Sequence, residues 1–145
     1  MHIPWYLAAI GAALLWGIHY PLIDNALRRV SLITVLLLTA LPIVVIAPLY
    51  YKNLVLDWGT LQAMTWSERT PVLALGLTSL GASALLFLSI GAKNATLASL
   101  IEISYPVFVA VFAYVLFRQV QVTPSVLVGG LLAFAGIAII ILGNP

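Results

Sequence analysis

One acidic residue, Glu102, lies inside the otherwise apolar run 94–117, within the stretch ASLIEISYP at 98–106. If that run is a helix beginning at Asn94, Glu102 lies about 12 Å into it, because a helix rises about 1.5 Å per residue. An ionised acid at the centre of an apolar membrane helix costs roughly 2.5–3.5 kcal/mol. A bound proton or cation removes this cost, so Glu102 could bind a proton or a cationic ligand reversibly. The alternative is a protonated side chain that only hydrogen-bonds a neighbouring helix.

His19 is the second titratable candidate. It lies about 6 Å from the end of the apolar run 4–23, which puts it in the same half of the membrane as Glu102. Imidazole changes its charge near physiological pH, so His19 could share a proton with the acid. The alternative is a histidine that is simply hydrogen-bonded near the interface. Trp16 and Tyr20 flank it at helical spacing and could either stack on a planar or cationic ligand or pack as interfacial aromatics.

The helix face that carries Glu102 is small and polar. Positions three, four and seven away are Ala95, Ala98, Ser99, Tyr105, Pro106 and Val109. A face turned to lipid would be rich in leucine. The stripe therefore predicts either the wall of a cavity, with Ser99 and Tyr105 facing a substrate, or a tight contact between helices.

The composition indicates that membrane-spanning helices hold these side chains. The chain has 145 residues, of which 63% are hydrophobic and 7% charged, against roughly 25% charged in soluble domains. Five apolar runs, at 4–23, 31–51, 71–92, 94–117 and 122–143, each approach the roughly 20 residues that a helix needs to cross the hydrocarbon core. The first run lacks a basic segment before it and a cleavage site, so we expect a helix there and not a signal peptide. The sequence predicts an all-α membrane protein with one domain, 1–145, and five transmembrane helices.

Other functional classes find little support in the sequence. There is no HExxH, GxSxG, P-loop or dinucleotide-binding pattern, so we do not expect an enzyme. With zero cysteines, thiolate metal sites are excluded, and we expect neither a metal nor a cofactor. The net charge of +2 is too small to favour nucleic acid.

The links between the runs predict antiparallel neighbours. DNALRRVS at 24–31 reads as a polar turn, and AKN and RQVQVTP join the later runs. The longest link, 51–71, has Trp58, Leu61 and Trp66 near helical spacing, which predicts either an interfacial amphipathic helix or an irregular loop. Three prolines lie inside predicted helices and should bend them: Pro42, Pro48 and Pro106.

Positive charge is balanced across the predicted membrane. With the N-terminal side named side A and the other side B, side A carries Lys52, Arg69 and Arg118, and side B carries Arg28, Arg29 and Lys93. Orientation normally follows an excess of lysine and arginine in cytoplasmic loops. The balance therefore favours insertion in both orientations and an antiparallel homodimer. The alternative is a single orientation set by a local feature, such as Arg28 and Arg29 close to a helix end.

The last run reads GGLLAFAGIAIIILG from Gly129. Gly129, Ala133 and Gly136 bring small residues to nearly one face, which lets helices approach closely. The pattern predicts a dimer contact, or equally close packing within one chain.

The order of these motifs resembles one family. LGASALLFLSIGAKNATLASLIEISYPVFVAVFAYVLF, VGGLLAFAGIAIII and the LLWG of 14–17 are similar to one five-helix repeat of the EamA-type transporters, within the drug/metabolite transporter superfamily. The resemblance implies a secondary transporter of small metabolites or drugs, in which two inverted repeats complete ten helices. It places Trp16, His19, Glu102 and Tyr105 near a central cavity and Gly129 to Gly136 at the contact between repeats.

Two departures leave the mechanism open. Arg118 follows Phe117 where the family often has an acid, and AALLW lacks the glutamate of the four-helix multidrug relatives, so Glu102 would have to serve in proton coupling. Two other hypotheses are a flippase-like exporter of lipid-linked or amphipathic molecules and a non-transporting membrane subunit. We expect a multi-pass protein of a prokaryotic inner or plasma membrane.

Overall fold

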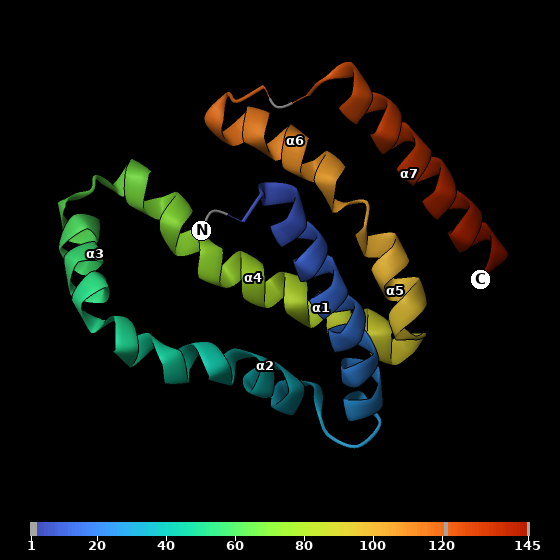
Figure 1. Cartoon of the computed structure of the whole chain (residues 1–145), viewed down its shortest axis with the longest axis horizontal. Coiled ribbons are helices and arrows are strands. Elements are labelled where there is room, and N and C mark those ends of the chain that lie inside the picture. Colours follow the sequence, from blue (N-terminus) through green and yellow to red (C-terminus); the bar gives the residue numbers. More distant parts are fainter. Residues whose placement is uncertain (1–2, 121, 145) are drawn as a thin grey trace.

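The computed structural model describes residues 3–120 and 122–144, and the ordered elements of this part are all helices. Within it, five helical spans are long and apolar enough to cross a membrane: Trp5–Leu27, Leu32–Ala63, Trp66–Ala92, Ala95–Phe117 and Pro124–Gly143. Figure 1 shows α1 and α4 crossing near the centre, with α5, α6 and α7 on one side and α2 and α3 on the other. The predicted all-α class and its five spans are confirmed.

The first span, α1 (Trp5–Leu27), is longer than the predicted run 4–23. The stretch from Asp24 to Leu27, which we expected in a polar turn, is its last helical turn. Pro21 lies inside the helix and does not end it. Hydropathy marks only the part of a helix that is buried in hydrocarbon, so a polar final turn at the membrane surface escapes it.

The second span is not one straight helix. α2 (Leu32–Ile46) is followed by the 3₁₀ turn η1 (Ala47–Tyr50), which contains Pro48, and then by α3 (Tyr51–Ala63). Figure 1 shows α3 turned away from the line of α2, as expected where a proline lacks the amide for a helical bond. The link to α4 is therefore largely helical, and the irregular-loop alternative is wrong.

The third span, α4 (Trp66–Ala92), begins before the predicted residue 71. Thr65 and Glu68 form a capping box, in which the Thr65 amide donates to Glu68 Oε2 at 2.9 Å. Arg69 also donates to the carbonyls of Gln62 and Met64, at 2.9 and 3.0 Å. These bonds fix the tight junction between α3 and α4.

The fourth span is two helices where the sequence predicted one bent helix over 94–117. α5 (Ala95–Glu102) ends at the acid, and α6 (Tyr105–Phe117) begins three residues later, with Pro106 in its first turn. The fifth span, α7 (Pro124–Gly143), begins at its proline and lies within the predicted 122–143.

The buried residues gather at one end of the bundle. The described residues that are buried are Ile23, Val35, Phe87, Ile90, Ala95, Ala98 and Ile137. Each lies in the half of its span nearer to side B. Side chains in the side A halves, such as Trp5 and Leu14, are exposed within the single chain. The buried core of the described residues therefore lies at side B, and α6 and α7 meet in the side A half through Val107 and Gly130.

Candidate functional site

The break in the fourth span occurs at Glu102. Pro106 has no amide, so the helical bond that would reach the Glu102 carbonyl cannot form. The amides of Ile103 and Ser104 turn back to Ser99 and Ile101. Among the described residues, no backbone amide bonds the carbonyls of Glu102 or Ile103 across this break. The acid thus lies beside free carbonyl oxygens, an arrangement that favours a bound cation or proton over an anion.

Tyr20 of α1 holds the acid in place. Its hydroxyl donates to Glu102 Oε2 at 2.6 Å, and both residues are partly buried. A hydroxyl that donates to a carboxylate makes a short bond, about twice as strong as a bond between neutral groups. The sequence had placed Tyr20 as an aromatic that could stack on a ligand or pack at the membrane interface. The structure gives it a second role, as the hydrogen-bond partner of Glu102.

His19 contacts an aromatic ring and makes no hydrogen bond to the acid among the described residues. Its Nε2 atom is buried without a partner among these residues. The imidazole instead meets the Trp16 ring edge-on, with ring centroids 5.3 Å apart. Trp16 also lies 5.3 Å from the Tyr20 ring. His19, Trp16 and Tyr20 therefore form one aromatic cluster next to Glu102, and a proton shared by His19 and Glu102 stays a prediction.

The other predicted cavity residues lie on either side of the break. Ser99 is half-buried on α5, and its hydroxyl donates to the Thr96 carbonyl. Tyr105 begins α6 and is 57% exposed. Their contact with a substrate stays a prediction.

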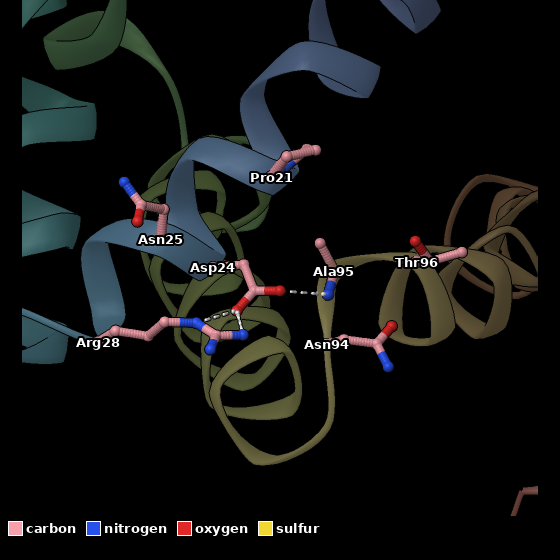
Figure 2. Close-up of a pocket in the computed structure, with 7 residues that line it drawn as sticks. All are labelled: Pro21, Asp24, Asn25, Arg28, Asn94, Ala95 and Thr96. Carbon is pink, nitrogen blue, oxygen red and sulfur yellow. Dashed lines mark hydrogen bonds and ion pairs between the residues drawn. The ribbon is translucent and has the colours of Figure 1, made fainter.

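Asp24 is a polar residue of this region that we did not single out from the sequence. It lines a pocket of about 270 Å³ between α1 and α5, with Pro21, Asn25, Arg28, Asn94, Ala95 and Thr96 (Figure 2). Asp24 Oδ2 accepts from the Ala95 amide at 3.3 Å, and Oδ1 pairs with Arg28 at 3.3 Å. The sequence held one indication of Asp24: it lies four residues after Tyr20, so the two share a helix face if α1 continues to residue 27.

The glycines of α7 differ in whether they make a close contact within the chain. A side chain at Gly130 would come within 3.1 Å of Val107 on α6, so α7 approaches α6 through Gly130. At Gly129 and Gly136 a side chain would meet nothing within 4 Å. These two glycines are therefore not needed for close packing inside the chain, and their predicted role with Ala133 in a dimer contact stays a prediction.

The architecture defines a five-span helical membrane protein with an acid at a helix break. A family model described as the EamA-like transporter family matches residues 3–142. The chain belongs to this family, and the resemblance noted in the sequence is confirmed. Comparisons with curated proteins and with solved structures find no match. No cluster of three or more possible metal ligands of the histidine, cysteine or carboxylate type occurs among the described residues.

Proposed function

We propose that this membrane transporter carries small metabolites or drug-like molecules by alternating access, driven by a proton or cation gradient. Glu102 is the coupling site in this proposal. The observation that carries it is the 2.6 Å bond from Tyr20 to Glu102 at the broken end of α5. Membership of the EamA-like family supports the transport part of the proposal. The arrangement around Glu102 supports the part that couples transport to a proton or cation gradient.

The chemistry of the break supports a cation or a proton as the coupling species. Discontinuous helices in secondary transporters bring unwound carbonyls and the negative C-terminal ends of half-helices to the coupling ion. Glu102 is the last residue of such a half-helix. Protonation would weaken the bond from Tyr20, because the acceptor would lose its charge. Loading the site would therefore loosen α1 from α5.

The position of the buried core at one end supports alternating access. The buried side chains lie at side B, while the side A halves of the helices hold none of the fully buried residues described. A transporter must close one end while it opens the other. In the proposed cycle the side B contacts separate after Glu102 is loaded.

An antiparallel homodimer is the assembly that we propose. The balanced charges on the two sides support it, because they favour neither orientation. A second, inverted copy would cover the side A halves. The open faces at Gly129 and Gly136 offer one site for that contact.

The test uses Glu102→Gln in proteoliposomes that contain a pH-sensitive dye. A panel of small cationic and neutral compounds is added, and the loss of an imposed pH gradient is measured for each. Wild-type protein should dissipate the gradient with at least one compound, and Glu102→Gln should abolish this response. Glu68→Gln is the matched control, because glutamine also satisfies a capping box. Equal responses of wild type and Glu102→Gln would refute coupling at this residue.

One observation favours a second function, the export of amphipathic molecules. A groove of about 350 Å³ between α6 and α7 is lined almost entirely by apolar side chains, among them Val107, Val111, Leu127 and Phe134. Such a groove suits an acyl chain. Transport of a fluorescent lipid between leaflets, blocked by Val111→Trp, would favour this function, and transport of only water-soluble compounds would exclude it.

A further inference from the structure

Two hydrogen bonds link α1 to α5, and they lie on one face of each helix. Tyr20 and Asp24 are four residues apart on α1, and Ala95 and Glu102 are seven apart on α5. Tyr20 bonds Glu102 inside the span, and Asp24 bonds the Ala95 amide at the side B end. We call the contact between these two helix faces the seam. One hydrogen bond joins it inside the span, at Glu102, and the other joins it near the membrane surface, at Ala95.

The surface bond is made by a residue with two partners. The Asp24 side chain is 22% exposed, and its second oxygen pairs with Arg28, whose side chain is 73% exposed. Arg28 follows Asp24 by one turn of the same chain segment, so this ion pair does not join two helices. The Ala95 amide does join them, because it is the first amide of α5 and has no acceptor within its own helix. Ala95 itself is buried in the side B core.

The α5 helix is bounded by extended backbone at its start and by a short turn at its end. Lys93 and Asn94 precede it, with Asn94 extended at φ −173° and ψ 167°, and Ile103 and Ser104 follow it. Asn94 accepts from the Leu97 amide at 2.9 Å, which fixes the start of the helix. This eight-residue segment can therefore move as one unit between its two ends.

We propose that the bond from the Ala95 amide to Asp24 is the latch that closes side B, and that Asp24 is a positioning residue for Glu102. While the bond holds, the first turn of α5 is fixed to α1, and Glu102 stays in reach of the Tyr20 hydroxyl. When it breaks, α5 swings away from α1, and the polar pocket around Asp24 (Figure 2) opens into the seam. The latch needs a hydrogen-bond acceptor at position 24, and it does not need the ion pair with Arg28.

The chain has no cysteine, so a single introduced thiol reports on the seam. Ser99 lies between Ala95 and Glu102 on the same face of α5 and is half-buried. Ser99→Cys is made alone and in combination with Asp24→Leu, Asp24→Asn, Ala95→Pro or Arg28→Gln. Labelling by N-ethylmaleimide is timed by mass spectrometry on membrane-embedded protein. The reagent crosses bilayers, so the result does not depend on orientation.

Asp24→Leu removes the acceptor and should raise the labelling rate on the order of ten-fold, as expected for a lost bond to a charged group. Asp24→Asn keeps an acceptor, and its labelling rate should stay within about two-fold of that of Ser99→Cys alone.

Ala95→Pro removes the donor and leaves Asp24 intact. Proline suits the first helical position, and the extended Asn94 suits a following proline. Ala95→Pro should therefore match Asp24→Leu, and it tests the latch if Asp24→Leu fails to fold.

Arg28→Gln separates the latch from the ion pair and should label like Ser99→Cys alone. Labelling of Arg28→Gln as fast as Asp24→Leu would overturn the proposal, and so would unchanged labelling of both Asp24→Leu and Ala95→Pro. The role in positioning Glu102 rests on the proposed function, whereas the labelling experiment needs no transport. If Glu102→Gln leaves coupling intact while the labelling pattern holds, the proposed coupling fails and the latch stands.

Discussion

The Tyr20 hydroxyl and the Glu102 carboxylate, 82 positions apart in the chain, are joined at 2.6 Å. This contact brings the last third of α1 to the point where the fourth span is broken. The acid accepts from the Tyr20 hydroxyl, and among the described residues no backbone amide bonds the carbonyls of Glu102 and Ile103. The charge of the acid can therefore be stabilised, and the same surroundings can respond when that charge is lost.

Tyr20→Phe removes the hydroxyl and keeps the ring. A hydrogen bond to a charged group contributes roughly 1.5–3 kcal/mol, so the free energy of unfolding should fall by about that amount where Glu102 is ionised. Unfolding in mixed micelles measures it, with the exposed Tyr50→Phe as control. An unchanged free energy of unfolding would show that the Tyr20 hydroxyl does not bond Glu102.

Pro106→Ala restores the amide that can reach the Glu102 carbonyl. Pro106 lies in the first turn of α6, where proline is tolerated, so the stability of the variant should change little, while the restored amide should let α5 run into α6. Gradient-driven transport should fall by on the order of ten-fold, because the free carbonyls and the hinge are lost. Hydrogen exchange of residues 102–107 and the proteoliposome assay measure the two effects. Pro42→Ala, in α2, controls for removal of a helix proline away from the acid, and full transport by Pro106→Ala would remove the break from the mechanism.

Gly129→Leu tests the proposed contact between copies. A side chain at Gly129 meets nothing within 4 Å in the single chain, so the fold should tolerate the change while pairing is lost. Cross-linking in membranes and mass measurement in mild detergent report the oligomeric state. Gly76→Leu in α4, where space is equally open, is the matched control. Undiminished pairing of Gly129→Leu would move the contact to another face.

Reporters fused to the C-terminus test insertion in both orientations. A reporter active only in the cytoplasm and one active only outside should both give signal, because positive charge is balanced between the sides. Adding two lysines beside Lys93 should bias the chain toward the orientation with side B inside. A single orientation of the unaltered chain would contradict the antiparallel homodimer.

Hydropathy predicted the spans better than their ends. A run of apolar residues reports the thickness of hydrocarbon, so the five spans followed from the sequence. The extension of α1 through Asp24 and the early start of α4 did not follow, because polar turns and caps at a membrane surface look like loops. Pro106 predicted a bend, and the structure divides the span into α5 and α6, joined by a turn at Ile103 and Ser104. The sequence does not show how neighbouring helices pack against this span, and that packing decides between one bent helix and two helices.

The site was predicted in part for a related reason. Glu102 stood out because an acid is costly in an apolar run. Its partner could not be chosen from depth alone, since His19 and Tyr20 are adjacent in sequence but project from different sides of α1. The rotation of α1 about its axis placed the tyrosine toward α5, and packing between helices sets that rotation.

The one-ended core has a consequence for the energetics of the proposed pair. If two identical chains lie antiparallel, each membrane face receives the side B end of one copy and the side A end of the other. Exchanging the conformations of the two copies then gives a state related to the first by symmetry, with the same intrinsic free energy. Without a gradient neither facing direction would be favoured. The direction of net transport would then be set by the solutes and ions on the two sides of the membrane, and not by the protein.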